Sequence, residues 1–269
     1  MTLRRILLLL AAAGALAAQT FVQMTDPQFG MFTDNKSFDH ETANFEFAVA
    51  AANRIRPAFV IVTGDLVNRA GDAAEIAEYK RIAAKLAPPV RLFNIPGNHD
   101  VGNEPTPDSL AEYRAQFGPD YYAFREGDIA GFVLDSCLER NVPAVADEAA
   151  KMEAWLKTEL AKARQDGVKS LIVFQHHPFF LKDPQEPDVY ENVPRPVRRR
   201  YLALLHEFGV RYVFAGHTHK NYDAADGDLH VIVSAPVGKP LGGAQSGLRV
   251  VTVTPGGLSQ KYYDFGDLP

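Results

Sequence analysis

The sequence predicts an α/β fold with parallel strands in its N-terminal part. Apolar runs of strand length alternate with segments whose apolar residues recur at helical spacing, in the order strand, helix, strand, helix, strand. This alternation favours parallel pairing of neighbouring strands through right-handed crossovers. Polar side chains of the kinds that bind ligands follow the ends of several strands, and open α/β sheets bind ligands at that edge.

The first half of the chain contains three of the expected strands and two of the expected helices. Asp72 is expected to cap the second helix, with Glu75 three residues later in the pattern of a capping box. Pro57 and the pair Pro88-Pro89 end the two helices. In order, the expected elements are a strand over 21–25, a helix over 42–55, a strand over 58–63, a helix over 73–86 and a strand over 91–96.

The second half is expected to contain further helices and strands in one continuous domain, residues 18–269, because no repeat or linker interrupts the pattern. The proline- and acid-rich loop 181–192 is expected to be mobile. Arg198-Arg199-Arg200 is expected to form a solvated helix face and not a phosphate grip. The expected helices span 106–117, 147–165 and 195–208, and the expected strands span 121–125, 129–135, 170–175, 210–215, 229–234, 247–254 and 258–263.

Composition places the chain among ordinary globular proteins. It has 269 residues, of which 46% are hydrophobic and 23% are charged, and its formal net charge is -5. This balance gives no reason to expect binding to nucleic acid or to an anionic membrane. The single cysteine, Cys137, is expected to be a buried thiol, since a lone cysteine cannot form an internal disulfide.

The N-terminal segment has the features of a secretory signal peptide. Arg4 and Arg5 precede an apolar stretch over 6–16 that is too short to span a membrane, and small residues follow it. We expect residues 1–17 to form the signal, with cleavage after Ala17 or Ala18. The mature protein is then secreted or periplasmic, with no stable membrane anchor. A retained N-terminal anchor is the alternative.

Five strand ends deliver side chains that are common metal ligands. Because the carboxyl ends of parallel strands meet at one edge of a sheet, these side chains are expected to converge. The five segments are Asp26-Pro27-Gln28, Gly64-Asp65, Gly97-Asn98-His99-Asp100, His176-His177-Pro178 and Gly216-His217-Thr218-His219. The candidate ligands among them are Asp26, Gln28, Asp65, Asn98, His176, His217 and His219.

This ligand set indicates two divalent transition-metal ions. Carboxylate, imidazole and amide groups together suit Mn, Fe or Zn better than Ca. Seven ligands are too many for one ion, and a shared carboxylate would serve two. Two ions about 3.5–4 Å apart are typical of enzymes that catalyse displacement at phosphorus with a metal-bridging hydroxide as nucleophile. His99 is then free to stabilise charge or to protonate the leaving oxygen, with Asp100 orienting it.

The order of these motifs resembles that of the calcineurin-like metallophosphoesterase superfamily, and the resemblance extends from about Thr20 to the C-terminus. It implies a four-layer α/β/β/α sandwich of two mixed sheets flanked by helices. It further implies that Asp65 bridges the two metals, and that His176 is the ligand while His177 packs behind the ligands or faces the substrate. The implied first metal has the ligands Asp26, Gln28, Asp65 and His219, and the second has Asp65, Asn98, His176 and His217.

Gln28 stands where this superfamily usually has histidine. The same glutamine, with similar sequences over 97–103, 174–178 and 246–251, makes the chain similar to the branch that contains the protein phosphatase called complete S-transactivated protein. An amide oxygen is a weaker and harder ligand than imidazole. We therefore expect a looser first metal and a preference for Mn or Fe, with Zn possible.

The function expected from these features is hydrolysis of a phosphomonoester. The protein phosphatases of the resembling branch work in the cytosol, whereas this chain carries an export signal, so a small phosphorylated molecule is favoured over a protein as substrate. One alternative is a phosphodiesterase acting on cyclic nucleotides, nucleotides or phospholipid head groups. Another is a metal- or anion-binding module without catalysis.

Overall fold

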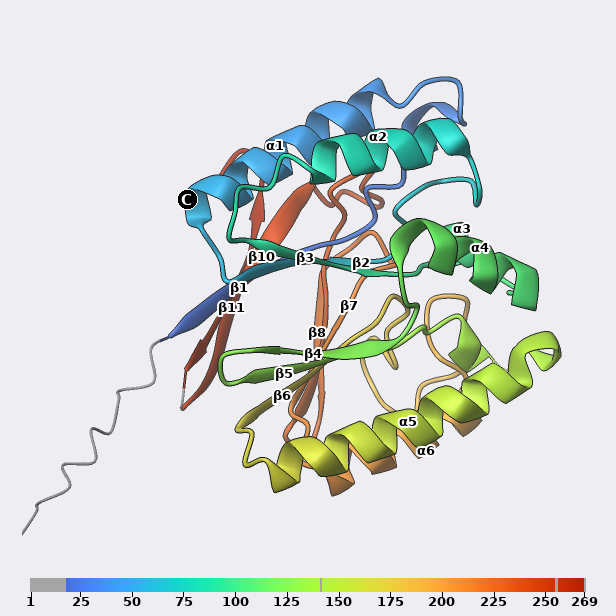
Figure 1. Ribbon diagram of the computed structural model, residues 1–269, viewed down its shortest axis with the longest axis vertical. Coiled ribbons are helices and arrows are strands. Elements are labelled where there is room, and N and C mark those ends of the chain that lie inside the picture. The colour runs from blue at the N-terminus through green and yellow to red at the C-terminus, as the bar shows by residue number, and fades with distance from the viewer. Residues whose placement is uncertain (1–17, 141, 255, 269) are drawn as a thin grey trace, which may run out of the picture.

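The computed structural model describes residues 18–140, 142–254 and 256–268. The expected signal peptide, residues 1–17, lies outside this part of the chain. The described residues form four layers, in which α1 and α2 cover one sheet while α5 and α6 cover the other (Figure 1). The predicted α/β/β/α sandwich of two mixed sheets is therefore confirmed.

The first sheet has the strand order β11-β10-β1-β2-β3. The three strands from the N-terminal half, β1, β2 and β3, pair in parallel, as predicted. The two C-terminal strands, β10 and β11, extend the sheet by antiparallel pairing. The strands are β1 (Gln19–Met24), β2 (Phe59–Thr63), β3 (Arg91–Ile95), β10 (Gly247–Thr254) and β11 (Gly257–Asp264), and the covering helices are α1 (Asp39–Ile55) and α2 (Ala73–Ala83).

The second sheet has the order β4-β5-β6-β7-β9-β8, with antiparallel hairpins at both edges. One edge strand, β8, was not predicted, because its sequence Tyr-Asp-Ala-Ala-Asp lacks the apolar run that marks the other strands. The strands are β4 (Tyr122–Glu126), β5 (Ile129–Val133), β6 (Ser170–Phe174), β7 (Tyr212–Ala215), β8 (Tyr222–Asp226) and β9 (Leu229–Val233), and the covering helices are α5 (Ala146–Gln165) and α6 (Arg195–Glu207).

Short helical segments connect these layers. The helix α3 begins within the Gly97-Asn98-His99-Asp100 motif and was not predicted, whereas the next helix matches its expected range closely. These are α3 (Asn98–Val101) and α4 (Pro107–Phe117), and single 3-10 turns span Met31–Thr33, Leu138–Arg140 and Pro143–Val145.

Phenylalanines fill the space between the two sheets. Phe93 of β3 stacks on Phe124 of β4 with ring centroids 3.8 Å apart, so this contact joins the sheets directly. Phe21 of β1 meets Phe174 and Phe214 of the second sheet edge-on, at 5.6 and 5.3 Å. Burying each such side chain stabilises the fold by about 1.5–3 kcal/mol, and the ring contacts add to this. The aromatic core thus holds the sheets face to face.

A buried polar network fixes the two sheets at the end where the predicted ligands lie. Gln23 of β1 donates from Nε2 to the carbonyl oxygen of Ala215 in β7, at 2.9 Å. The hydroxyl of Ser234 donates to Gln23 Oε1 at 2.7 Å, and Arg249 Nε donates to Ser234 Oγ at 2.7 Å. Because buried polar groups are costly when unpaired, this network favours a single relative position of the sheets.

The start of α2 agrees with the prediction only in part. The Asp72 carboxylate accepts hydrogen bonds from the backbone N–H groups of Ala74 and Glu75, as expected for an N-cap. The Glu75 side chain does not complete a capping box. It accepts hydrogen bonds instead from the backbone N–H groups of Asn68 and Arg69, at 2.8 and 2.9 Å. Glu75 therefore holds the loop that follows β2, next to the predicted ligand Asp65.

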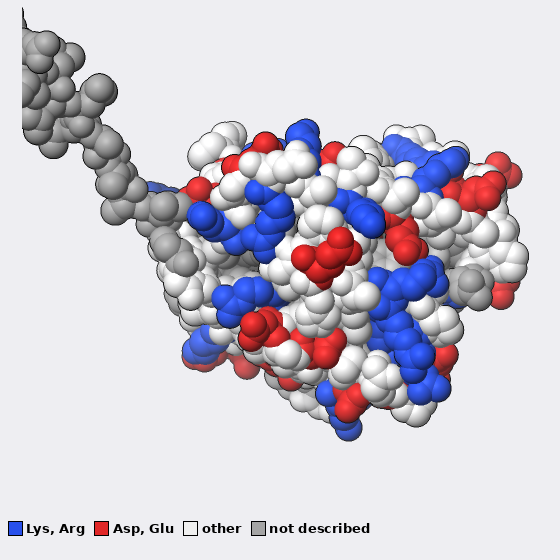
Figure 2. All heavy atoms as spheres, turned by 90° about the horizontal axis from the view of Figure 1, so that it is seen from below, with Lys and Arg blue, Asp and Glu red and all other residues white. Residues whose placement is uncertain are grey.

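Basic and acidic side chains are interspersed on the face formed by α5 and α6 (Figure 2). Some form ion pairs, such as Arg200 of α6 with Glu153 of α5 at 3.1 Å. Exposed pairs of this kind contribute at most about 1 kcal/mol each. In the described part of the chain, no helix is both long enough and apolar enough to cross a membrane.

The loop 181–192, expected to be mobile, is held by many hydrogen bonds. The Glu186 carboxylate accepts from the backbone N–H groups of Leu181 and Lys182, and from the side chain of Asn192. Arg198 of α6 is fully buried and donates to the carbonyl oxygens of Val193, Pro184 and Glu186. The prediction of a solvated arginine face is therefore wrong for Arg198, although Arg199 and Arg200 are exposed.

Replacing Arg198 should loosen this loop. We expect Arg198→Ala to lower the free energy of unfolding by about 2–3 kcal/mol, because carbonyl oxygens at buried positions lose their donor. Limited proteolysis should then cut within 181–192 faster than in the unchanged protein. Arg199→Ala, which removes an exposed neighbour, is the control. Equal urea-unfolding curves and equal cleavage rates for the two variants would contradict the assigned role.

Candidate functional site

The predicted ligands from both sheets lie close together at the carboxyl ends of their strands. His176, which follows β6, has its Nε2 atom 3.3 Å from Asp65 Oδ2 and 3.1 Å from Asn98 Oδ1. The same atom lies 4.0 Å from Asp26 Oδ1. His219, which follows β7, has its Nε2 atom 3.4 Å from Asp26 Oδ1. The two sheets thus deliver one cluster of carboxylate, amide and imidazole atoms.

Most of the predicted metal ligands have a strained backbone with positive φ. A non-glycine residue in the left-handed region costs about 1–3 kcal/mol and is concentrated at functional sites. The geometry of this cluster is therefore maintained at a cost to stability. The predicted ligands with positive φ, between 44° and 69°, are Asp26, Gln28, Asp65, His217 and His219.

Two glycines allow the ligands of one sheet to approach the other sheet. A Cβ atom on Gly64, at the end of β2, would lie 2.3 Å from Nδ1 of His176. A Cβ atom on Gly216, after β7, would lie 1.8 Å from the Thr25 hydroxyl and 2.7 Å from Asp26 Oδ2. Any larger residue at either position would push the two sets of ligands apart.

Backbone carbonyl groups set the orientation of three histidine rings. Nδ1 of His176 lies 2.8 Å from the carbonyl oxygen of Thr63, and Nδ1 of His219 lies 2.5 Å from that of Lys239. A carbonyl oxygen only accepts, so each Nδ1 carries a proton and Nε2 is left free. Metal-binding histidines are commonly held in this way, and here both Nε2 atoms point at carboxylates. His99 Nδ1 makes the same kind of bond, at 2.8 Å, to the carbonyl oxygen of Asn68.

Three of the predicted ligands carry buried atoms without a hydrogen-bond partner among the described residues. These atoms are Asp26 Oδ1, Gln28 Oε1 and His217 Nε2. The Gln28 amide nitrogen donates to Asn68 Oδ1 at 3.2 Å, which leaves its oxygen as the unpaired atom. A buried polar atom without a partner costs about 1–3 kcal/mol. Cations would satisfy all three atoms, so the residues present fit a metal site.

Neighbouring charges shift the pKa values of several residues in the cluster. Burial acts to lower the pKa of His176, but the carboxylates of Asp65 and Asp26 outweigh it and raise the pKa to about 9. Burial acts to raise the pKa of Asp65, but the neighbouring His176 outweighs burial and lowers this pKa. Burial and the neighbouring His176 lower the pKa of His217 to about 3. Cations would compete with protons for these same atoms.

Asp100 does not orient His99, contrary to expectation. Its carboxylate accepts hydrogen bonds from the backbone N–H groups of Leu66, Val67 and Gly97, at 2.8–3.1 Å. Burial and the charge of Asp65 raise the pKa of Asp100 to about 8 despite these donors. Asp100 therefore joins the loop after β2 to the loop after β3. The carbonyl oxygen of Asn68, and not Asp100, orients the His99 ring.

His177 is buried beside two of the predicted ligands, His176 and His217. It is 1% exposed, and its ring centroid lies 4.2 Å from that of His217. Its backbone N–H donates to Ser136 Oγ at 2.8 Å, and burial lowers the pKa of its imidazole well below the usual range. Its Nε2 atom is buried and has no hydrogen-bond partner among the described residues, and one of its ring nitrogens lies within 4.8 Å of ligand atoms in His176 and His217. His177 could therefore contribute to a metal site itself, a role that was not predicted for it. His99, in contrast, is partly exposed.

Three residues at the site were not predicted from the sequence. The Thr25 hydroxyl donates to Asp26 Oδ2 at 2.5 Å, and Asn68 contacts both Gln28 and His99. Thr25 and Asn68 lie within three residues of a predicted ligand, so their positions in the sequence could have indicated that they belong to the site. Tyr190 accepts a hydrogen bond from Asn98 Nδ2 at 3.1 Å, but it comes from a loop without any motif.

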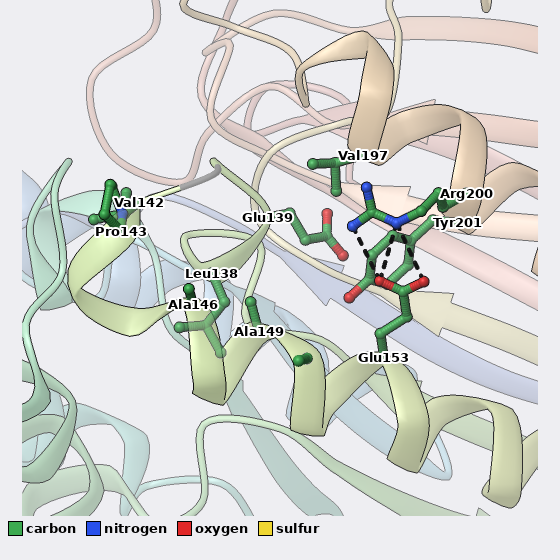
Figure 3. Close-up of a pocket in the computed structure, with 11 residues that line it drawn as sticks. Leu138, Glu139, Val142, Pro143, Ala146, Ala149, Glu153, Val197, Arg200 and Tyr201 are labelled. Atoms are coloured by element: carbon green, nitrogen blue, oxygen red, sulfur yellow. Dashed lines mark hydrogen bonds and ion pairs between the residues drawn. The ribbon is translucent and has the colours of Figure 1, made fainter.

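A separate pocket of about 230 Å³ lies in the helical layer, and none of the predicted ligands lines it (Figure 3). Arg200 and Glu153 form an ion pair at this pocket, beside Tyr201 and Glu139. Both carboxylate oxygens of Glu139 are buried and have no partner among the described residues, and burial raises its pKa well above the usual range.

Comparison with known proteins agrees with the geometry of the strand ends. The family model for calcineurin-like phosphoesterases matches residues 20–221. The serine/threonine-protein phosphatase CPPED1 of Bos taurus is 34% identical over 266 residues, covering 92% of this chain and 84% of the relative. That of Danio rerio is 32% identical over 263 residues, covering 92% and 85%.

A solved structure of a dimetal phosphatase from Danio rerio superimposes with a TM-score of 0.65, covering 91% of this chain and 99% of that one. Because only 15% of the residues are identical, this superposition shows a shared fold alone. The family match spans most of the described chain, and the clustered carboxylate, amide and imidazole atoms suit metal ions. The chain therefore belongs to the calcineurin-like phosphoesterase family and is a dimetal phosphoester hydrolase.

Proposed function

We propose that this hydrolase is a phosphomonoesterase that acts on small phosphorylated molecules. The observation that carries the proposal is the set of unpartnered buried atoms, Asp26 Oδ1, Gln28 Oε1 and His217 Nε2, in a cluster reached by His176 and His219. Its relatives are named phosphatases, which supports a monoester as substrate.

The predicted ligands would divide between two metal positions, with Asp65 serving both. Asp26, Gln28 and His219 would hold the first ion together with Asp65, and the short separation of His219 from Asp26 supports this grouping. Asn98, His176 and His217 would hold the second ion together with Asp65, supported by the contacts of His176 with Asp65 and Asn98. Two such ions polarise phosphate oxygens and lower the pKa of bound water.

His99 is proposed to deliver the proton to the leaving oxygen. Its backbone N–H donates to Asp65 Oδ1 at 2.8 Å, which places the residue beside the shared carboxylate. Its Nδ1 is held by Asn68, so Nε2 is the atom available for proton transfer. Its partial exposure allows contact with a substrate. Asp100 acts here as a positioning residue for the loops that carry Asp65 and Asn98.

The choice of substrate class depends on where the protein acts. The relatives are named serine/threonine-protein phosphatases, so a phosphoprotein is the first candidate by similarity. The N-terminal segment, however, has the pattern of an export signal, and phosphoproteins are scarce outside the cell. A small phosphomonoester therefore fits the chain better.

The ester specificity can be tested with the mature chain loaded with Mn. We expect para-nitrophenyl phosphate to be hydrolysed faster than its bis-ester, because a monoester presents its phosphate oxygens to two cations. Hydrolysis of the bis-ester alone would indicate a phosphodiesterase. No hydrolysis of either compound would indicate a binding module that has lost catalysis.

The variant His99→Ala tests the role proposed for His99. It should slow turnover by about 10²–10⁴-fold, the usual contribution of a positioned acid, while both metals stay bound. Metal content measured by atomic emission separates the two effects. Loss of metal from this variant would contradict the role assigned to His99.

We expect the metal preference to depend on Gln28. An amide oxygen at the first position favours Mn or Fe, whereas imidazole suits Zn well. Metal titration of Gln28→His should therefore show tighter binding at one site and a shift toward Zn. Gln165→His, at an exposed position on α5, is the matched control. Unchanged affinity and preference in Gln28→His would show that residue 28 is not a ligand.

We further propose that the mature protein acts outside the cytoplasm, as a secreted or periplasmic enzyme. The first strand begins at Gln19, so cleavage after Ala17 or Ala18 would remove no part of the described sheet. Mass spectrometry of the protein made in a secreting host should give an N-terminus at Ala18 or Gln19. An uncleaved chain in the membrane fraction would contradict this proposal and favour a retained anchor.

A further inference from the structure

We propose that the ring of Tyr190 binds the leaving group of the substrate and selects esters in which that group is aromatic or otherwise apolar. The inference rests on the monoesterase function proposed above and assigns the class of its substrate. It depends on the position of Tyr190 at the predicted metal ligands, on the way its loop is held, and on the exposure of its ring.

Tyr190 lies directly against two of the predicted ligands. Its hydroxyl accepts a hydrogen bond from Asn98 Nδ2 at 3.1 Å, and its ring centroid lies 4.9 Å from that of His217. Asn98 Oδ1 faces His176 on the opposite side of the amide. The tyrosine hydroxyl thus keeps the Asn98 oxygen turned toward the metal position, while 51% of the side chain remains exposed.

The backbone at Tyr190 is held from outside its loop. Nη1 of Arg140 donates to the carbonyl oxygens of Tyr190 and Asn192, both at 2.9 Å. The guanidinium of Arg140 also lies 5.8 Å from the centre of the Tyr190 ring. Together with the buried Arg198, these bonds hold the ring in place before a ligand arrives, so binding to it loses little conformational entropy.

Two segments that carry exposed apolar side chains contact predicted ligands, whereas Phe47 lies on α1 and packs against Phe265. In the described part of the chain, the large hydrophobic side chains that remain exposed are Val189, Tyr190, Leu241 and Phe47, at 46%, 51%, 42% and 44%. Val189 is next to Tyr190, and the backbone N–H of Leu241 donates to the carbonyl oxygen of His219 at 3.3 Å. A single exposed apolar residue needs no explanation, but the Tyr190 ring also contacts a predicted ligand, so we take this ring as the apolar surface at the site.

This surface suits the part of the substrate that the metals do not contact. Bound cations and His99 would act on the phosphate group and on the ester oxygen, which are common to all phosphomonoesters. The group beyond that oxygen is the part that differs between substrates. An aromatic group placed there would bury apolar area against the Tyr190 ring, and ring contacts add to this gain.

Binding of two phosphonates that are not hydrolysed tests this inference directly. Calorimetry with the Mn-loaded protein should show tighter binding of phenylphosphonate than of methylphosphonate. Compared with Tyr190→Phe, in which the hydroxyl bonded to Asn98 is also absent, Tyr190→Ala should bind phenylphosphonate about threefold to tenfold more weakly, as expected for loss of a ring contact, and methylphosphonate less than about twofold more weakly. Tyr190→Phe lacks the hydroxyl but keeps the ring, so it should retain the preference for the phenyl compound.

Phe47→Ala is the matched control, because it removes an aromatic side chain of similar exposure from α1. It should leave the binding of both phosphonates unchanged. If Tyr190→Ala weakened both phosphonates equally, or if the unchanged protein showed no preference, the inference would be overturned even where monoesters are hydrolysed. A preserved phenyl preference without any hydrolysis would instead contradict the proposed function alone.

Discussion

The close approach of the two sheets at their carboxyl ends is the constraint on which the site depends. His176 of the second sheet lies over Gly64 of the first, and Asp26 of the first lies against Gly216 of the second. The absence of a side chain at both glycines lets atoms from different sheets come within 4.0 Å of each other. The site therefore exists only when the whole sandwich is assembled, because neither sheet carries a complete ligand set.

This approach is unfavourable in itself and has to be offset by the rest of the fold. Five predicted ligands occupy the left-handed backbone region, and three present buried atoms without partners. Each such feature costs about 1–3 kcal/mol. The phenylalanine core between the sheets and the network of Gln23, Ser234 and Arg249 provide compensating contacts. Bound cations would stabilise the folded state further, since they would bind the assembled cluster and not the separated strands.

The strand ends could be predicted from the sequence, whereas the surroundings of the site could not. Asp26, Asp65 and His217 stand directly after apolar runs, and the period of those runs identifies the strands that deliver them. The partners that orient the site are mostly backbone atoms, such as the carbonyl oxygen of Asn68, and no residue type reveals them. The roles expected for Asp100 and Glu75 were wrong for this reason, since both carboxylates accept from backbone N–H groups of neighbouring loops.

Arg198 and Tyr190 show the same limit in the loop 181–192. Their local sequence is that of a solvated helix and a polar loop, and only the packing of α6 against that loop buries the arginine. The loop then places Tyr190 against Asn98, a predicted ligand that follows a strand of the other sheet and lies 92 residues away in the sequence. The groups that would perform the reaction are therefore encoded in short motifs at strand ends. The residue that we propose to contact the variable part of the substrate is positioned by tertiary structure, which is why one family can retain its chemistry while its substrates change.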